Sequence, residues 1–163
     1  MSEPISLQIR FATEADITLI FHFIQALASY EDLLDHFEAT EQRLANYLFG
    51  KRPKAHVLLA EHGGESAGFA VYYFTFTTFA GLPGIYLEDL FVKPEKRRAG
   101  IGRALLKHLA QLAKQEGCCR IEWAVLHWNE SAISFYEKLG AQRVDDWSTY
   151  RLFGEALRSL GQD

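Results

Sequence analysis

The stretch from Val92 to Ala104 constrains this chain more than any other part of its sequence. Before it, residues 85–92 are rich in β-branched and aromatic side chains, which is typical of a buried strand. After it, apolar residues recur at helical spacing over residues 101–113. The sequence therefore predicts a strand that enters a basic turn, followed by Gly100, Gly102 and a helix.

The start of such a helix is suited to an anion such as a phosphate group. Its first backbone N–H groups have no partner within the helix, and the positive end of the helix dipole lies there. The two glycines lack the β-carbons that would keep a large anion away from this backbone. Cationic side chains surround the turn at Lys93, Lys96, Arg97, Arg98 and Arg103. These residues favour a phosphate-binding turn; an ordinary basic turn that caps a surface helix is the alternative.

Neither of the common nucleotide motifs fits this turn. A P-loop requires Lys followed by Ser or Thr after its second glycine, whereas Arg103 and Ala104 stand here. A Rossmann fingerprint requires a small residue three positions after its second glycine, and Leu105 occupies that position. The pattern Arg97-x-x-Gly100-x-Gly102 instead resembles the acyl-CoA pyrophosphate loop of the GNAT family of N-acetyltransferases.

Composition predicts a globular α/β protein with one domain over residues 1–163. The chain is 48% hydrophobic and 23% charged, and its length is enough to bury a core. We expect no membrane partner, because no apolar run is long enough to span a bilayer. The net charge of −4 argues against a nucleic-acid partner and mildly favours a cationic one. Cys118 and Cys119 are adjacent and cannot join distant parts of a fold, so we expect a reducing, cytoplasmic location.

Hydrophobic periodicity divides the chain into alternating strands and helices. Strands are predicted at residues 7–11, 56–61, 67–78, 85–92, 120–126, 141–144 and 149–153. Helices are predicted at residues 14–29, 41–49, 101–116 and 130–139, with a helical tail around Leu157 and Leu160. Residues 30–36 are interpreted as an acidic, solvated connector.

Further segments resemble the spermidine/spermine and thialysine acetyltransferase branch of the GNAT family. They cover nearly the whole chain and comprise Tyr30-Glu31, Tyr72–Thr75, Tyr86–Val92, Trp128–Glu130, Phe135-Tyr136 and Arg151–Phe153. The resemblance implies a mixed, mostly antiparallel sheet flanked by helices, whose strands at Leu90 and Val125 splay to admit acetyl-CoA. It also implies a homodimer formed through the C-terminal segments, where Trp147, Tyr150 and Phe153 supply an aromatic surface.

Acetylation of an amine requires two proton transfers. The amine, with a pKa of about 10, must lose a proton to a carboxylate or an ordered water, and a Tyr hydroxyl can protonate the departing thiolate. Glu88 and Asp89 are adjacent in a predicted strand, so one carboxylate is expected on each face. By resemblance, Glu88 receives the amine proton through water and Tyr136 is the acid. A solvent-facing Glu88 and a Tyr136 that packs in the core are the structural alternatives.

The resemblance also implies two sets of binding residues. Acetyl-CoA, as co-substrate, is expected to contact the turn, the adjoining strand and the short later helix through Leu90, Phe91, Val92, Arg97, Arg98, Ala99, Gly100, Ile101, Gly102, Arg103, Asn129, Ser131, Ala132 and Tyr136. Asn129 could serve merely as a helix cap. The acceptor is expected to contact Tyr30, Glu31, Glu88, Asp89, Glu122, Trp123, Ala124, Ser148 and Tyr150. The six histidines show no metal-ligand spacing, so no metal is expected, and no activated nucleophile is visible, which favours direct attack by the amine.

The predicted acceptor pocket departs from the polyamine-acetylating members. Ser148 and Tyr150 stand where those members carry an acidic residue and a Trp, while His127 and Phe79 replace another acidic residue and another Trp. Fewer acidic groups weaken the case for a long polycation, unless Asp145 or Asp146 takes over their role. We therefore expect a small cationic primary amine, such as a diamine, a polyamine or a thialysine- or lysine-like molecule. The alternatives are a protein or peptide N-acetyltransferase of the same fold and a non-catalytic acyl-CoA-binding module.

Overall fold

The computed structural model describes residues 6–162, and these form two compact units with the boundary between Ala124 and Val125. The first unit is built on one five-stranded sheet with the order β1-β2-β3-β4-β5. Its strands are β1 (Leu7–Phe11), β2 (His56–His62), β3 (Glu65–Thr77), β4 (Leu82–Val92) and β5 (Ile121–Glu122). Every neighbouring pair is antiparallel except β4 and β5, which run parallel. The expected mixed, mostly antiparallel sheet is confirmed.

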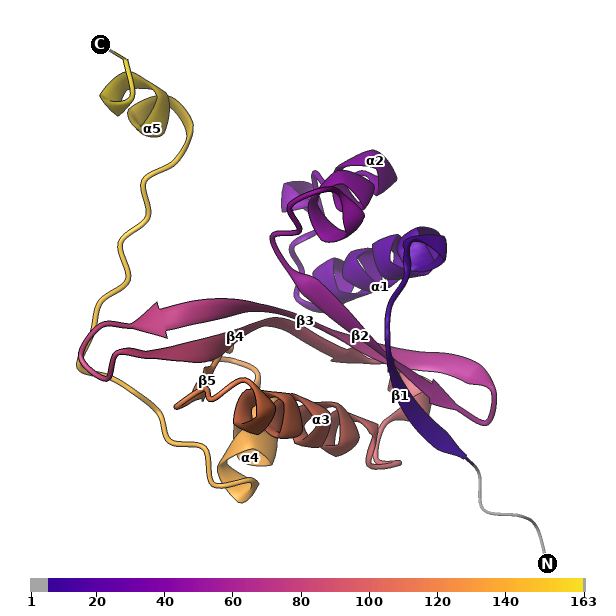
Figure 1. Ribbon diagram of the computed structural model, residues 1–163. Helices are drawn as coiled ribbons and strands as arrows, with labels where there is room; N and C mark the ends of the chain where they lie inside the picture. Colours follow the sequence, from indigo (N-terminus) through magenta and orange to yellow (C-terminus); the bar gives the residue numbers. More distant parts are fainter. Residues whose placement is uncertain (1–5, 163) are drawn as a thin grey trace, which may run out of the picture. The chain divides into compact units, whose positions relative to one another are not determined.

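Helices cover both faces of this sheet (Figure 1). One face carries α1 (Ile17–Tyr30) and α2 (Glu41–Leu44), which continues as a π-helix over Ala45–Phe49. The other face carries α3 (Ile101–Gln115), whose residues Ile101, Leu105 and Leu109 are fully buried. The core beneath α1 consists of Ile20, Phe23, Leu27, Val57, Leu59, Phe69, Val71 and Phe91.

The predicted helix starts are confirmed by their capping contacts. Thr13 and Asp16 form a capping box around a 3-10 turn, Glu14–Asp16, which leads directly into α1. The side chain of Thr40 accepts a hydrogen bond from the backbone N–H of Arg43 and so caps α2. The connector after α1 is not a loop throughout, because Leu34–His36 form a further 3-10 turn.

A β-bulge interrupts the pairing of β3 with β4. Tyr72 pairs with Leu87 and Val71 pairs with Asp89, so Glu88 is one extra residue on β4. The extra residue reverses the side-chain alternation along β4. As a result Leu87 is buried on the α3 face, whereas Asp89 and Phe91 lie opposite Val71 and Phe69 on the α1 face.

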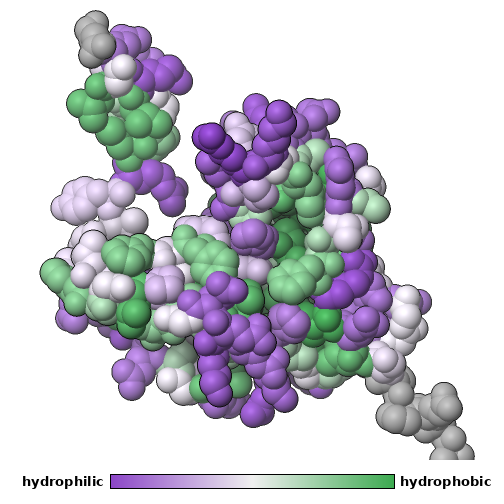
Figure 2. All heavy atoms as spheres, in the orientation of Figure 1, coloured by the Kyte–Doolittle hydropathy of each residue, from purple (hydrophilic) through white to green (hydrophobic). Residues whose placement is uncertain are grey.

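The second unit contains α4 (Glu130–Lys138) and α5 (Gly154–Leu160). The strands predicted at 141–144 and 149–153 are wrong, since this segment forms neither helix nor strand. Alternation of apolar and polar residues is not sufficient for a strand, which also needs a partner for its backbone groups. The strand predicted at 120–126 is reduced to the two residues of β5. Figure 2 shows apolar side chains on the visible face of α5, where Leu157 and Leu160 are exposed.

No helix within residues 6–162 has the length and apolar character needed to cross a membrane.

Candidate active site

The turn between β4 and α3 leaves an accessible helix start. After a 3-10 turn at Pro94–Lys96, the backbone passes through positive φ at Arg98 (65°) and at Gly100 (78°). Residues 97–100 are exposed, and a β-carbon added at Gly100 would meet no atom within 4 Å. Within residues 6–162 no side chain caps α3, so its first N–H groups lack a side-chain partner there. A left-handed conformation is costly for an arginine, and such strain concentrates at binding sites. This geometry fits a phosphate group.

The side chain of Arg97 is held against the end of α1. Its Nε donates a hydrogen bond of 3.0 Å to the carbonyl oxygen of Val92. Its guanidinium carbon lies 4.6 Å from the centre of the Tyr30 ring and 5.9 Å from that of the Phe91 ring. One arginine of the expected cofactor loop therefore contacts Tyr30, which was expected at the acceptor site.

The half of β4 that adjoins the turn is paired on one side by β3. Leu90, Phe91 and Val92 lie opposite Ala70, Phe69 and Gly68. On the other side, β5 pairs only with Ile85 and Tyr86. The backbone of Leu90–Val92 is therefore placed where an extended ligand could hydrogen-bond to it as an added strand.

The bulge places Glu88 beside two tyrosines. Tyr73 and Tyr86 face each other across β3 and β4, with ring centres 5.3 Å apart and ring planes at 29°. The Glu88 carboxylate lies close enough to both rings for its charge to act on both hydroxyls. Burial and then the nearby charge of Glu88 raise the pKa of both tyrosines, so both hydroxyls remain protonated. The sequence alone does not indicate that Tyr73 and Tyr86 lie next to Glu88, because this proximity depends on the register of β3 and β4.

Three carboxylates gather between the end of α1 and the bulge. Burial, together with the charges of Glu88 and Glu31, raises the pKa of Asp89 to about 7. Burial also raises the pKa of Glu31. The expectation of one carboxylate on each face is wrong, because the bulge turns both Glu88 and Asp89 toward the α1 face. Of the predicted acceptor residues, Tyr30, Glu31, Glu88 and Asp89 are thus brought together.

Glu122 reaches the same region through β5. It pairs in register with Tyr86, and its negative charge contributes to raising the pKa of that tyrosine. An ion pair of 2.8 Å with Arg120 partly neutralises Glu122. Trp123 and Ala124 follow directly at the end of the first unit. Glu122 therefore attracts a cation less strongly than the three carboxylates at the bulge do.

In the second unit, the predicted residues are arranged around α4. The Asn129 side chain accepts a hydrogen bond of 3.2 Å from the N–H of Ala132, so Asn129 does serve as a helix cap. Ser131 lies in the first turn of α4, and Tyr136 lies on its later part with its ring centre 5.3 Å from that of Phe135. Beyond α4, Ser148 and Tyr150 are exposed in the segment without regular structure. Asp145 pairs with Arg143 at 2.6 Å, which reduces its attraction for a cation.

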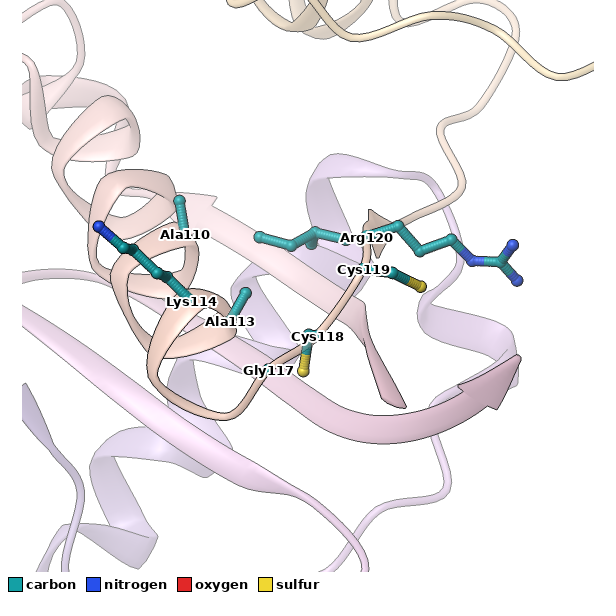
Figure 3. A pocket seen from close by; sticks show the side chains of 8 residues that line it. Ala110, Ala113, Lys114, Gly117, Cys118, Cys119 and Arg120 are labelled. Carbon is teal, nitrogen blue, oxygen red and sulfur yellow. The ribbon is translucent and has the colours of Figure 1, made fainter. Parts of the chain in front are cut away.

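A hollow of about 440 Å³ lies at the opposite end of α3 from the turn, between the helix and Cys118–Ile121. Figure 3 shows the sulfur atoms of Cys118 and Cys119 pointing in different directions. Burial raises the pKa of the Cys118 thiol, which keeps it in the less reactive protonated form. Cys118 is therefore not an activated nucleophile for acyl transfer.

Comparison with known proteins identifies the family. Residues 25–141 match the profile of the Acetyltransferase (GNAT) family. The chain is 39% identical to a thialysine N-epsilon-acetyltransferase of Sus scrofa, over 95% of this chain and 97% of that protein. It is 32% identical to an L-ornithine N5-acetyltransferase of Arabidopsis thaliana, over 94% of this chain and 87% of the relative.

Among solved structures, an integron cassette protein from the mobile metagenome of V. cholerae has a similar fold. Its TM-score is 0.80 with 32% sequence identity, and the match covers 97% of this chain and 99% of that one. The profile match spans more than half of the chain, and both named relatives are N-acetyltransferases. The chain therefore belongs to the GNAT family of acetyltransferases and is itself an enzyme of this class.

Proposed function

We propose that this enzyme transfers the acetyl group of acetyl-CoA to the primary amine of a small, lysine-like or diamine acceptor. The observation that carries the proposal is the group of three carboxylates at the bulge, Glu31, Glu88 and Asp89. Such a group attracts a cationic amine and provides a proton acceptor next to it. The names of two relatives support the same acceptor class, since thialysine and ornithine each carry a side-chain amine.

The turn between β4 and α3 suits the pyrophosphate of the co-substrate. The backbone N–H groups from Arg98 to Arg103 surround the accessible helix start, and Arg97 adds an unneutralised positive charge beside it. The Leu90–Val92 backbone would hold the pantetheine arm by strand-like hydrogen bonds. Acetyl-CoA supplies the acetyl group as an activated thioester.

The protein groups have separate roles in this scheme. Glu88 accepts the proton that the acceptor ammonium loses, through an ordered water, and so frees the nitrogen lone pair for attack on the thioester carbon. Tyr136 donates its hydroxyl proton to the sulfur as the carbon–sulfur bond breaks. The second proton that the nitrogen loses on amide formation returns through solvent to the Tyr136 oxygen, and Glu88 releases the first proton to bulk water. Asp89 stays close to the positive charge of the acceptor. No side chain carries the acetyl group at any stage.

The carboxylates also limit the choice of acceptor. Burial, together with the charges of Glu88 and Glu31, raises the pKa of Asp89 to about 7, so a bound cation would shift Asp89 to its charged form. This favours an acceptor with positive charge close to the reacting amine. A long polycation would need further acidic partners, and Asp145 is already paired with Arg143.

The experiment that tests this proposal measures CoA release with a panel of acceptors. The panel contains thialysine, lysine, ornithine, putrescine, spermidine and a lysine-containing peptide, and product masses identify the acetylated nitrogen. We expect the highest kcat/KM with the amino acids that carry a side-chain amine. Preference for the peptide would indicate a protein or peptide N-acetyltransferase, and absence of CoA release with every acceptor would indicate a non-catalytic acyl-CoA-binding protein.

We further propose that the enzyme is a cytoplasmic homodimer without a metal ion and that both units belong to one acetyltransferase domain. The profile match crosses the boundary between the units, which supports the single domain. Exposed aromatic side chains at Trp147, Tyr150 and Phe153 support an interface in the C-terminal part of the chain. Light scattering at micromolar concentration should give twice the mass of the chain, and a monomer mass would exclude the dimer.

A further inference from the structure

Arg97 is fixed by contacts that leave its charge available. Its partners are the face of the Tyr30 ring at 4.6 Å, the Phe91 ring at 5.9 Å and the carbonyl oxygen of Val92 at 3.0 Å. All three partners are uncharged. Among residues 6–162, no carboxylate lies within ion-pair distance of this guanidinium, in contrast to Arg10, which pairs with Asp16 and Glu61. Arg97 is therefore oriented without being neutralised.

The hydrogen-bonding capacity of Arg97 is mostly unused within the part of the chain that the structure describes. Only Nε donates a hydrogen bond there, to Val92. A guanidinium has four further N–H groups on its two terminal nitrogens, arranged in a planar fork that matches a phosphate group. An arginine held in one orientation loses little side-chain entropy when it binds an anion.

Tyr30 is the residue that supplies this orientation from outside the turn. It is the last residue of α1, and the remaining contacts of Arg97 come from β4 next to the turn itself. We propose that Tyr30 is a positioning residue for the cofactor site: its ring holds the Arg97 guanidinium ready for the pyrophosphate of acetyl-CoA. This inference rests on the proposed function, because it takes the turn at 98–103 to be the cofactor site.

The role is unexpected from the sequence, which places Tyr30 with the acceptor residues and Arg97 with the cofactor residues. If Tyr30 served only the acceptor, its replacement would leave the affinity for free CoA unchanged. If it positions Arg97, its replacement weakens CoA binding even when no acceptor is present. The two roles are thus separated by a binding measurement without turnover.

The test is titration calorimetry of CoA with the full chain, without acceptor, for the wild type, Tyr30→Phe and Tyr30→Leu. Phe keeps an aromatic face, so Tyr30→Phe should bind CoA as the wild type does. Leu removes the face, so Tyr30→Leu should raise the Kd by about two- to thirtyfold, the range of a cation–π contact. Tyr47→Leu is the matched control, because Tyr47 is exposed on the π-helix away from the turn, and it should leave the Kd unchanged.

A double-variant cycle with Arg97→Lys excludes a general loss of structure. Lys keeps the positive charge but not the planar fork or the Nε donor. If Tyr30 acts through Arg97, adding Tyr30→Leu to Arg97→Lys should weaken CoA binding no further than about twofold. If the Kd of the double variant rises by the product of the two single-variant factors, the inference is overturned. A Tyr30→Leu variant that binds CoA with wild-type affinity would overturn it as well. Neither result would contradict the proposed function. A wild-type enzyme that does not bind CoA would overturn both.

Discussion

The ring of Tyr73 on β3 stacks on the ring of Tyr86 on β4, with ring centres 5.3 Å apart, and the charge of Glu88 acts on both hydroxyls. This pair of rings lies next to the bulge, where Glu88 is the extra residue on β4. Glu88 is exposed, so a water molecule can reach its carboxylate. This position supports the proposed role of Glu88 as the group that receives the proton of the acceptor.

Replacement of Glu88 by Gln should lower kcat by about 10²-fold or more, because the amide cannot accept the ammonium proton. The loss should be greatest at low pH, where more of the free amine is protonated and depends on a base. The pH profile of kcat/KM between pH 6.5 and 9.5 checks this. Glu41→Gln, at an exposed position in α2, serves as the control and should match the wild type. Equal profiles for Glu88→Gln and the wild type would remove Glu88 from the reaction.

Replacement of Asp89 by Asn should flatten the dependence of stability on pH. Asp89 has a pKa of about 7 in the folded protein, against an ordinary value of 3.8. Between these values the unfolded chain ionises Asp89 while the folded protein keeps it protonated, so the free energy of unfolding falls as pH rises. The fall is at most about 1.4 kcal/mol per pH unit from this one group, and it ends above pH 7.

Urea unfolding at pH 4.5, 5.5, 6.5 and 7.5 measures this effect as the difference between the wild type and Asp89→Asn. The difference is needed because other carboxylates act in the opposite direction. The hydrogen bonds and charge of Arg10 lower the pKa of Asp16, for example, so its stabilising contribution is lost only as pH falls. A constant difference across the four pH values would show that Asp89 titrates normally in the folded protein.

Replacement of Gly102 by Val should raise the Kd for acetyl-CoA by roughly tenfold or more. The branched side chain would stand in the first turn of α3, where the phosphates approach the backbone N–H groups, and would remove charge-assisted hydrogen bonds. The helix itself should persist, because Val has a higher helix propensity than Gly. Calorimetry measures the affinity and circular dichroism measures the helix content.

The control for this variant is Ala110→Val, which adds a branched side chain at an exposed position of the same helix. It should leave the affinity for acetyl-CoA unchanged. Unchanged binding by Gly102→Val, with full helix content, would contradict the assignment of this turn to the cofactor.

Replacement of Tyr136 by Phe should reduce kcat by about 10²–10⁴-fold, the range expected for loss of a positioned proton donor. The affinity for acetyl-CoA should stay close to that of the wild type, because the ring and its packing against Phe135 are kept. Steady-state kinetics together with a CoA titration separate the two effects. Tyr47→Phe is the matched control, and a kcat loss no larger than that of the control would reduce Tyr136 to a packing residue.

Elements with local signals could be predicted from the sequence. The caps at Thr13, Thr40 and Asn129 and the apolar spacing of α3 depend only on residues a few positions apart. The bulge at Glu88 has no such signal, because it is a mismatch in residue count between β3 and β4. For this reason Glu88 and Asp89 were predicted on opposite faces, and the structure places both on one.

The candidate site was predictable only as far as the family resemblance reached. The resemblance selected Tyr30 and Glu88 as separate residues, but it did not indicate that Tyr30 touches Arg97 or that Tyr73 lies beside Glu88. Both contacts join parts of the chain that are distant in sequence, and side-chain periodicity carries no information about them. The prediction of strands at 141–144 and 149–153 was wrong for a related reason, because the alternating pattern of this segment does not specify a strand with which it could pair.

The short pairing of β5 with β4 bears on how the purified enzyme should be handled. Because β5 reaches only Ile85 and Tyr86, the remainder of β4 depends on a different neighbour to satisfy the backbone groups on that side. A strand edge of this kind can recruit a strand from another molecule and start aggregation. A ligand that lies along Leu90–Val92 would compete with a strand from another molecule for this edge. Preparations supplemented with CoA should therefore aggregate more slowly during concentration and storage.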